Sequence, residues 1–308
     1  MNIPDIQLIG DFFKVSNLEL VIQRRGGYVY KGVFNHKVVY IKLSTELAPF
    51  KREVEVLQAI PEAASFPQLI AHSEWQGWHA RVISEVPGVP LSHVLPTIQN
   101  DAERICLIET CGRLLASFHQ AFREPEISKL HFWHKDDQAQ SKLPQWQSYI
   151  QLLVNKWVGR IRFTEPDTQL NLEHAVKTIV ALSAQIPEPK TKSILHCDFV
   201  GRNIIVDSQS LVGLIDFEEV QIGDPAYDAA KFVWATLDWQ NQQETSAFYK
   251  AWARAYDAPQ DWHLFHIYIA IQSIAAIAWC DKNTLDTSEN ADFRTNAVKT
   301  LMTVVESF

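Results

Sequence analysis

The chain has 308 residues, and its content of 47% hydrophobic and 21% charged residues is ordinary for a globular protein large enough to form two lobes. The formal net charge of -8, without a cluster of lysine and arginine, argues against a nucleic-acid partner and favours a cationic small molecule. The four cysteines show no C-x-x-C spacing, so we expect reduced thiols in a cytoplasmic protein rather than a disulfide framework.

No segment is expected to insert into a membrane. The first residues lack a basic region followed by an apolar stretch, which argues against a signal peptide. The longest apolar segment, 267–280, is interrupted by Gln272 and Ser273 and is too short to span a bilayer. We therefore expect no membrane partner.

Two β-rich runs near the N-terminus predict a hairpin. Residues 28–34 and 37–43 are rich in valine, tyrosine and other strand formers, and two residues join them. Lys42 lies at the end of the second run. Gly26 and Gly27 precede the first run, where glycines permit close approach of the backbone to an anion, although two glycines are also typical of a plain turn.

A helix is predicted over residues 50–60, because apolar side chains recur there at helical spacing. It carries two glutamates, Glu53 and Glu55, which lie on roughly opposite faces. Either could pair with Lys42, and a lone pair of this kind is more often a solvated surface pair.

The next boundary signal is a break after a strand. Residues 80–86 predict a strand that ends at Pro87-Gly88. No Ser/Gly-rich, low-complexity or repetitive segment elsewhere offers a cleaner linker. We therefore expect two domains, residues 1–86 and 87–308.

Most of the chain beyond residue 101 is predicted to be helical, because apolar residues recur there with a period near 3.6. The predicted helical segments are 105–118, 146–161, 172–184, 225–237, 245–256, 262–279 and 290–306.

A second hairpin interrupts the helical pattern. The β-branched runs 203–206 and 211–215 are separated by four turn-forming residues, 207–210. Asn203 begins this hairpin and Asp216 follows its end, so these two side chains should lie side by side. Asp198 precedes Asn203 by five residues.

These three residue types form the set that phosphoryl transfer requires. One carboxylate must orient and deprotonate the attacking hydroxyl, while a carboxamide and a second carboxylate hold the Mg²⁺ ions that bridge the nucleotide phosphates. An ordinary hairpin with polar ends would explain any one of these residues but not the whole set.

The motifs around this hairpin match a known family in order and spacing. They resemble those of the aminoglycoside phosphotransferase and choline kinase family at His196-Cys197-Asp198, Asn203, Ile215-Asp216-Phe217 and Gly223-Asp224-Pro225 with Asp228. The resemblance implies an α+β, protein-kinase-like two-lobed fold, with a small β-rich N-terminal lobe and a larger, mainly helical C-terminal lobe.

The resemblance also implies roles for the motif residues. Asp198 would be the catalytic base, and Asn203 and Asp216 would be Mg²⁺ ligands. Asp228 would support the catalytic loop from beneath, and His196 would brace that loop by hydrogen bonding.

A nucleotide site is implied in the N-terminal lobe. Lys42 would hold the α- and β-phosphates of ATP or GTP. The family's Glu-x-x-x-Leu pattern selects Glu53 as the partner of Lys42. Backbone groups of Ser84, Glu85 and Val86 would contact the adenine edge.

The catalytic loop departs from the family pattern at Cys197 and at Val200-Gly201-Arg202, which replaces the frequent His-Pro-Gly. Cys197 replaces the usual glycine, and its alternatives are a small buried side chain or a nucleophilic thiol, for which no general base is evident. Gly26-Gly27 is expected to form the flap over the phosphates, although the full G-x-G-x-x-G is absent.

The acceptor is implied to lie near the catalytic loop and the late helices. Carboxylates there would bind ammonium groups, and tryptophan faces would attract cations. A surface or core role is the alternative for each candidate. The candidates are Glu218, Glu219, Trp234, Asp238, Trp239 and Asp281.

The leading hypothesis is a small-molecule kinase that uses ATP or GTP and Mg²⁺ to phosphorylate a hydroxyl of an aminoglycoside or aminocyclitol, an activity typical of antibiotic resistance. A metabolic kinase for choline, ethanolamine, homoserine or a sugar amine is the second hypothesis. A nucleotide-binding pseudokinase that acts through protein contacts is the third. The sequence leaves the oligomeric state open.

Overall fold

The computed structural model describes residues 4–24, 26–63, 65–124, 126–132, 143–163, 166–207, 212–283 and 288–308. The chain forms two compact units, each assembled from three stretches of sequence. The first unit consists of Met1–Leu107, Ser128–Ala139 and Gly201–Val220, and the second of Ile108–Ile127, Gln140–Val200 and Gln221–Phe308. Compactness thus assigns the hairpin after Asn203 to the first unit, whereas the functional boundary at residue 86 stays a prediction.

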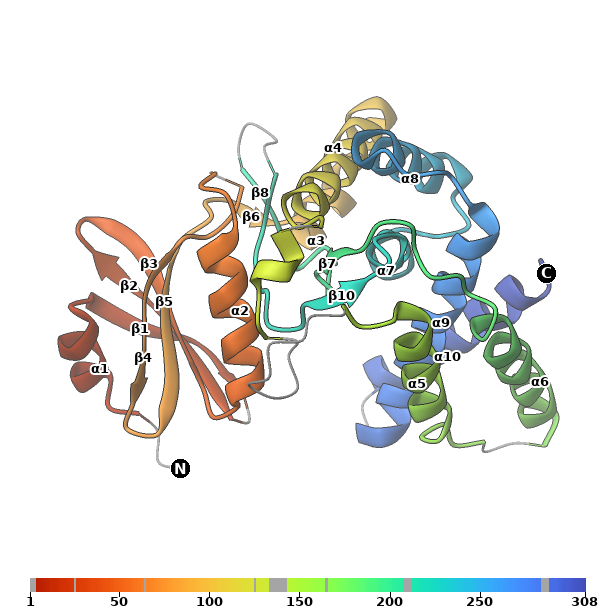
Figure 1. Ribbon diagram of the computed structural model, residues 1–308, viewed down its shortest axis with the longest axis horizontal. Helices are drawn as coiled ribbons and strands as arrows, with labels where there is room; N and C mark the ends of the chain where they lie inside the picture. The colour runs from red at the N-terminus through yellow and green to blue at the C-terminus, as the bar shows by residue number, and fades with distance from the viewer. Residues whose placement is uncertain are drawn as a thin grey trace. The chain divides into compact units, whose positions relative to one another are not determined.

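The first unit is built on a five-stranded antiparallel sheet (Figure 1). The predicted hairpin is present as its β2 and β3 strands, which pair from Gly27↔Ser44 to Phe34↔Lys37. β1, whose side chains are nearly all exposed, and β4 were not predicted from the sequence. The strands, in their order across the sheet, are β1 (Ser16–Arg24), β2 (Gly27–Phe34), β3 (Lys37–Ser44), β5 (Trp78–Ser84) and β4 (Leu69–Trp75).

The two faces of this sheet have different environments. Val39, Ile41 and Val82 lie in a buried core cluster that also contains Ile9 and Phe13 of helix α1 (Ile6–Phe13). Because side chains alternate along a strand, Lys42 points to the other face.

Helix α2 (Leu47–Ala59) packs against β4 and β5 and fulfils the helix prediction for this region. Phe50, Val54 and Leu57 are buried, as their spacing indicated. Glu53 is buried with them, at 0% exposure, and a fully buried carboxylate requires cationic partners.

A smaller sheet contains the second predicted hairpin. β8 (Ile204–Val206) pairs with β9 (Val212–Leu214), and β6 (Val89–Pro90) pairs with β8. Ile215 donates its N–H to the carbonyl of Asn203 at 3.0 Å, so the two ends of the hairpin are joined. The expected turn at 207–210 lies largely outside the described residues. A short helix, α3 (Leu91–Val94), and a 3-10 turn, η1 (Leu95–Thr97), follow β6.

The second unit is mainly helical, as predicted. Its two short strands, β7 (Ser193–Leu195) and β10 (Gln221–Gly223), pair antiparallel on either side of the catalytic motif in sequence. Helix α4 begins in the first unit and continues into the second. The helical elements are α4 (Asp101–Ala121), η2 (Glu126–Lys129), α5 (Trp146–Val158), α6 (Pro166–Ser183), α7 (Ala226–Thr236), α8 (Gln242–Tyr256), α9 (Trp262–Asn283) and α10 (Ser288–Val305).

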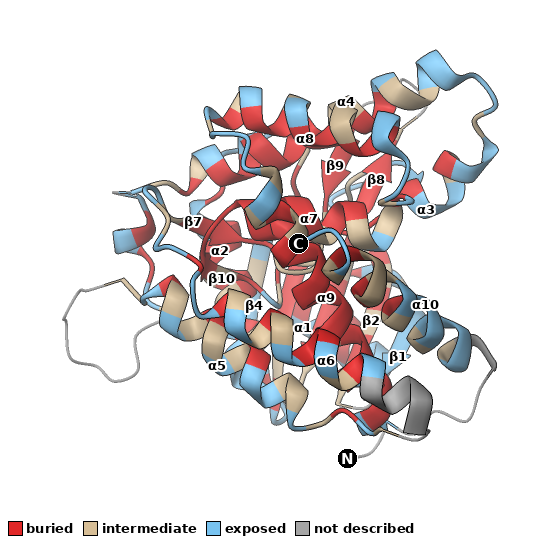
Figure 2. Cartoon of the chain, turned by 90° about the vertical axis from the view of Figure 1, so that its right-hand side faces the viewer, coloured by how far each residue is buried: buried red, intermediate tan, exposed pale blue. Residues whose placement is uncertain are grey.

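Helix α9 is the core helix of the second unit. Among the described residues it is the one helix long and apolar enough to cross a membrane, but 72% of that window is buried inside the structure. Figure 2 shows this burial along the helix. Its Tyr268 hydroxyl accepts from Trp146 Nε1 at 2.8 Å and donates to Asp224 Oδ2 at 2.8 Å, which ties the Gly-Asp-Pro motif to α5 and α9.

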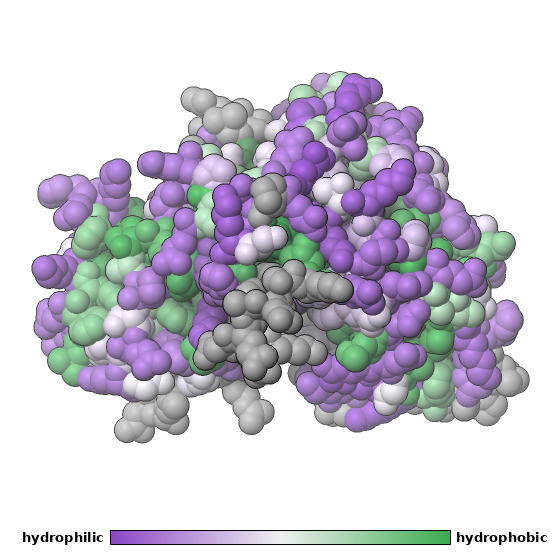
Figure 3. Space-filling view, in the orientation of Figure 1, coloured by the Kyte–Doolittle hydropathy of each residue, from purple (hydrophilic) through white to green (hydrophobic). Residues whose placement is uncertain are grey.

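The first unit keeps some apolar side chains at its surface. Leu20, Val21 and Ile22 of β1 are exposed, as are Leu8 and Phe12 of α1. Figure 3 shows hydrophobic surface over the sheet region of this unit. β1 lies at the edge of the five-stranded sheet, so one side of it presents backbone N–H and C=O groups instead of pairing with a further strand of that sheet.

Candidate active site

The Lys42 side chain is the centre of a charge cluster in the first unit. The residue is only 9% exposed. Its Nζ lies 2.9 Å from Glu53 Oε1, 2.7 Å from Asp216 Oδ1 and 2.9 Å from Glu218 Oε1. The expected Lys42–Glu53 pair is therefore present, while its role in phosphate binding stays a prediction.

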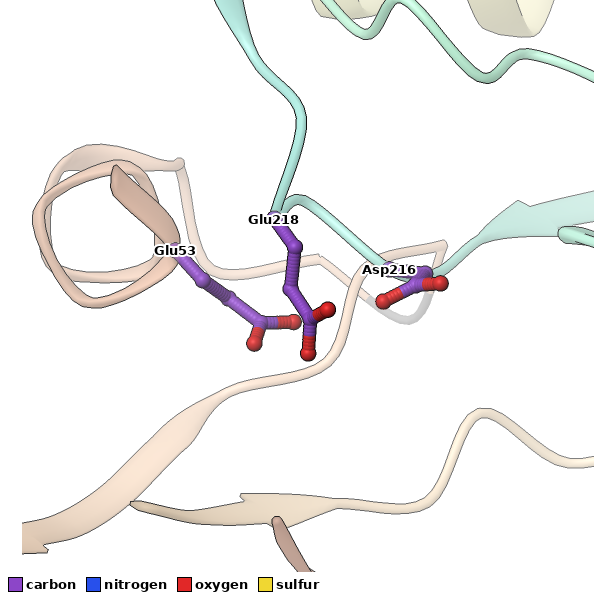
Figure 4. Close-up of side chains that lie close together, drawn as sticks. All are labelled: Glu53, Asp216 and Glu218. Atoms are coloured by element: carbon purple, nitrogen blue, oxygen red, sulfur yellow. The ribbon is translucent and has the colours of Figure 1, made fainter. Parts of the chain in front are cut away.

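Two parts of the chain supply the carboxylates. Glu53 comes from α2, and Asp216 and Glu218 come from the segment after β9, with all three side chains directed toward a common region (Figure 4). Phe217 N–H also donates to Glu53 Oε1 at 3.4 Å, which joins this segment to α2. Asp216 has φ of 73°, a left-handed conformation that aspartate tolerates better than most residues.

Arg81 of β5 is a member of the cluster that the sequence analysis missed. It is fully buried, its Nε binds Glu53 Oε2, and its Nη2 binds Glu218 Oε1. The alternating pattern of the strand does not predict a buried arginine. The available signal was that Arg81 interrupts the apolar run Ala80-Arg81-Val82. Arginine is almost never fully buried unless it is paired, so this position indicated a carboxylate partner.

Burial and charge act on these groups in opposite directions. Burial alone would lower the pKa of Lys42, but Glu53 and Asp216 outweigh it and raise that pKa above its ordinary value. Burial alone would raise the pKa of Glu53, but Arg81 and Lys42 hold it below its usual range. Both groups are thus charged near neutral pH, and the cluster contains three carboxylates against two cations.

The three carboxylates of the cluster could also bind a metal ion. Oxygens of Glu53, Asp216 and Glu218 lie within 4.8 Å of one another. Asn203 lies in the same unit, is 5% exposed and is joined to the Asp216 segment through the Ile215 hydrogen bond. Carboxylate and carboxamide oxygens are hard donors of the kind that Mg²⁺ prefers, so these residues fit the expected ion.

The expected adenine-contacting segment is already engaged in hydrogen bonds. Ser84 donates its N–H to Gln68 O at 2.9 Å, and Glu85 donates its N–H to Val38 O at 3.2 Å. The N–H groups of Ser84 and Glu85 therefore already donate hydrogen bonds within the protein. The prediction that these two residues contact the nucleobase now concerns their carbonyl groups. For Val86 the prediction stands unchanged.

Glu85 has a second connection through its side chain. Its carboxylate accepts from Lys31 Nζ at 3.1 Å and from the Tyr40 hydroxyl at 3.4 Å. Tyr40 lies two residues before Lys42 on β3 and therefore on the same face of the sheet.

Gly26 lies between β1 and β2, and Gly27 is the first residue of β2, where it pairs with Arg24. Gly26 has φ of 81°, and a Cβ there would lie 2.8 Å from Thr45 Oγ1, so a larger residue would be strained. The conformation explains the glycine as a turn residue. Its proposed contact with phosphates stays a prediction.

A second polar cluster lies in the second unit, beneath the catalytic motif. Asp228 is fully buried and accepts the N–H of His196 at 2.5 Å and the N–H of Cys197 at 2.8 Å. His196 Nδ1 accepts the N–H of Asp198 at 3.3 Å. These contacts are of the kind expected of Asp228 and His196, whose supporting roles in catalysis stay predictions. Asp198 belongs to this unit, whereas Asn203 and Asp216 belong to the first.

His119 of α4 completes this cluster. Its Nε2 lies 3.1 Å from Asp228 Oδ2, and its Nδ1 lies 3.2 Å from Trp252 Nε1. An indole nitrogen can only donate, so Nδ1 must accept and the proton must be on Nε2. His119 therefore donates to Asp228, which receives three N–H groups.

Cys197 has φ of 61°. This left-handed conformation is one that glycine adopts at little cost and other residues rarely adopt. It accounts for the glycine that the family usually has at this position, and it indicates backbone strain next to Asp198.

The acceptor candidates have varied surroundings. Asp281 accepts from Arg294 Nε at 2.6 Å and from the N–H of Arg162 at 2.7 Å, an arrangement that favours a structural role over acceptor binding. Trp234 donates from Nε1 to Ser273 Oγ at 2.9 Å. The expected roles of Asp281 and Trp234 in acceptor binding stay predictions.

The remaining candidates divide between the two units. Asp238 is exposed and accepts the N–H of Gln240, and the Trp239 ring meets the His266 ring edge-on. Glu219 is 65% exposed, with Oε2 3.8 Å from Arg52. Glu218 lies with Lys42 and Arg81 in the charge cluster, and its expected role in acceptor binding stays a prediction.

Comparison with protein families identifies the relatives of this chain. A family model described as the phosphotransferase enzyme family matches residues 35–268, which include β3 with Lys42, the β8–β9 hairpin and every catalytic motif. The chain belongs to the phosphotransferase enzyme family. The prediction that it is a phosphotransferase is thereby confirmed. Comparison with curated protein sequences gives no significant match.

Solved structures similar to this phosphotransferase cover almost its whole length. They include a thermostable mutant of aminoglycoside phosphotransferase APH(4)-Ia in a ternary complex with AMP-PNP and hygromycin B, with 16% identity, a TM-score of 0.69, and 98% of this chain and 97% of that chain covered. Spectinomycin phosphotransferase APH(9)-Ia, in complex with ADP and spectinomycin, has 14% identity, a TM-score of 0.65 and coverage of 99% and 98%.

A third similar structure is the choline kinase LicA from Streptococcus pneumoniae, with 14% identity, a TM-score of 0.60 and coverage of 98% and 97%. At such identities the likeness concerns the fold. It confirms the predicted α+β, protein-kinase-like fold.

Proposed function

We propose that this phosphotransferase transfers the γ-phosphoryl group of ATP or GTP to a hydroxyl of a small cationic molecule. The observation that carries the proposal is the Lys42 cluster, in which a buried lysine, its glutamate partner and Asp216 come together from three separate elements. A purely structural ion pair would need one carboxylate, and this lysine has three.

Each residue has one task in the proposed reaction. Lys42 binds the α- and β-phosphates, and Glu53 holds the ammonium group in place. Asp198 accepts a hydrogen bond from the acceptor hydroxyl and takes its proton. Asp228 accepts the backbone N–H groups of His196 and Cys197 and thereby keeps Asp198 in position.

Asn203 and Asp216 would hold Mg²⁺. When bound, this ion neutralises charge on the phosphates during transfer. The backbone link between Ile215 and Asn203 keeps these two ligands at the same end of the hairpin.

The proposed acceptor is an aminoglycoside or aminocyclitol. The chain has a net charge of -8, which would raise the local concentration of a polycation. Similar folds bind hygromycin B in APH(4)-Ia and spectinomycin in APH(9)-Ia. Glu219 and Asp238, both exposed, are the carboxylates best able to meet an incoming amine.

A metabolic amino alcohol is the second candidate acceptor. It is supported by the likeness to the choline kinase LicA. Choline, ethanolamine and homoserine carry one positive charge, whereas aminoglycosides carry several. Salt dependence therefore separates the two, because exposed charge pairs are screened over about 10 Å at 0.1 M salt.

The decisive experiment is an assay of nucleotide consumption against a panel of aminoglycosides, aminocyclitols and amino alcohols, with the products identified by mass. We expect one class to gain 80 Da, the mass of a phosphoryl group, in a reaction that requires Mg²⁺. For a polycationic acceptor, affinity should fall over a tenfold rise in salt more than nucleotide affinity does. Nucleotide binding without transfer to any member of the panel would instead favour a pseudokinase.

A further inference from the structure

Glu218 holds the most unusual position in the Lys42 cluster. Its Oε1 is shared by two cations, with Lys42 Nζ at 2.9 Å and Arg81 Nη2 also in contact. Its side chain is 26% exposed, so solvent and ligands can reach it, whereas the Glu53 side chain is fully buried. One carboxylate of the cluster is therefore fixed and another is accessible.

Glu53 is fixed because each of its oxygens has its own cation. Oε1 accepts from Lys42 at 2.9 Å, and Oε2 accepts from Arg81. Releasing either contact would leave part of a buried carboxylate uncompensated, which is costly. Glu53 is not a group that can leave when a ligand arrives.

Lys42 can bind phosphate only if one of its carboxylate partners leaves, and Glu218 is able to do so. A lysine that already has three carboxylate partners must give up at least one of them to bind phosphate oxygens. Glu218 can leave Lys42 without losing its charge compensation, because Arg81 stays in contact with the same oxygen. The rigid fork of the guanidinium group lets Arg81 hold Glu53 and Glu218 together.

We propose that Glu218 is an exchangeable counter-ion, which holds Lys42 before nucleotide binds and releases it to the phosphates, while Arg81 retains the displaced carboxylate. Arg81 is then a positioning residue for nucleotide binding. This inference rests on the proposed function, because it assumes that Lys42 binds phosphates. It goes further by assigning a competitor and a retaining group to that step.

The exchange predicts that removing the competitor strengthens binding. In Glu218→Gln the carboxamide has no charge to compete with phosphate, so we expect the dissociation constant for metal-free ATP to fall about fivefold. In Arg81→Met, a change of similar volume, Glu218 depends on Lys42 alone, and we expect the constant to rise about tenfold. Adding Glu218→Gln to Arg81→Met should recover most of that loss.

The test is calorimetric titration of the full chain with ATP in the presence of a chelator, without acceptor. The chelator removes any contribution from metal ligation by Glu218. Glu74→Gln is the matched control, since it removes a carboxylate of the same unit that is 79% exposed and has no assigned role in binding. Its dissociation constant for ATP should stay within about twofold of the wild type. Circular dichroism confirms that each variant is folded.

A simple structural role for Glu218 could not strengthen binding, so a gain of affinity in Glu218→Gln and not in Glu74→Gln supports the exchange. Unchanged or weaker binding by Glu218→Gln would overturn it. If Arg81→Met does not fold, the comparison of Glu218→Gln with Glu74→Gln decides alone. Wild-type protein that binds neither ATP nor GTP even with Mg²⁺ would overturn the proposed function itself, which is a different outcome.

Discussion

The two polar clusters of this phosphotransferase use charge in different ways. The cluster around Lys42 contains three carboxylates and two cations, and two of the carboxylates are partly exposed. The cluster around Asp228 contains one buried carboxylate, and the backbone of the catalytic loop and the His119 ring supply its hydrogen-bond donors.

The difference indicates what each cluster is suited to do. An unbalanced, accessible set of charges can exchange a protein partner for a ligand. A carboxylate whose bonds are satisfied by fixed backbone donors cannot exchange and instead holds a loop in one conformation. Variants of the first cluster should therefore change ligand binding, and variants of the second should change stability and turnover.

The largest effect is expected at Asp198, the residue that the Asp228 cluster positions. Asp198→Asn should reduce turnover by about 10²-fold or more, because it removes the proton acceptor, and leave ATP affinity nearly unchanged. Initial rates with a confirmed acceptor and calorimetric ATP binding measure the two quantities. Near-normal turnover would rule out Asp198 as the base.

Asp228→Asn should test the fixed cluster directly. A carboxamide has only one acceptor oxygen in place of two, so a buried N–H at His196, Cys197 or His119 loses its partner. We expect a loss of about 3 kcal/mol in the free energy of unfolding, measured by urea denaturation. Asp238→Asn, at an exposed position, is the control and should change stability by less than about 0.5 kcal/mol.

Stability of the Lys42 cluster should depend on pH through Glu53. Its pKa is held below the ordinary value, so its stabilising contribution is present above about pH 4.5 and is lost as the pH falls through the lowered pKa. The free energy of unfolding should thus decline below about pH 4.5 in the wild type. Glu53→Gln should be less stable at pH 7 and show a flatter acid decline, as urea denaturation at several pH values can establish.

At alkaline pH, the stability that this cluster contributes should fall as the pH rises. The pKa of Lys42 is raised by its carboxylate partners, so the contribution of this group is complete below about pH 10.5 and is lost as the pH rises further. If the free energy of unfolding of the wild type declines at neither acid nor alkaline pH, the charge states assigned to the cluster are wrong.

The smallest effect is expected from Cys197→Gly. Glycine relieves the strain of the left-handed conformation, and its extra freedom in the unfolded chain offsets part of that gain. We expect about 1 kcal/mol of added stability, measured by thermal or urea denaturation. A loss of stability would show that packing of the thiol outweighs the backbone strain.

Sequence patterns predicted those parts of the fold that are formed by residues close together in the sequence. Both hairpins and the helices of the second unit follow from strand propensity, turn residues and helical periodicity, and the structure contains them. β1 was missed because its exposed side chains give no inside–outside alternation. The spacing of Asp198, Asn203 and Asp216 predicted the catalytic motif because these residues lie close in sequence.

Partners that are distant in sequence could not be predicted in the same way. Nothing in the sequence indicates that Arg81 contacts both Glu53 and Glu218, since 137 residues separate Arg81 from Glu218. His119 and Trp252 are 133 residues apart, and only the folded chain brings the ring and the indole together. Glu53 could be chosen over Glu55 only through the family pattern.

The discontinuous first unit has a consequence for synthesis of the protein. Lys42, Glu53 and Arg81 are made early, but Asp216 and Glu218 belong to the third stretch of the same unit. At about 5–20 residues per second, on the order of ten seconds separate Arg81 from these carboxylates on the ribosome. During that interval Lys42 and Arg81 have Glu53 as their only carboxylate from this cluster, so the cluster can be completed only after Glu218 has been made.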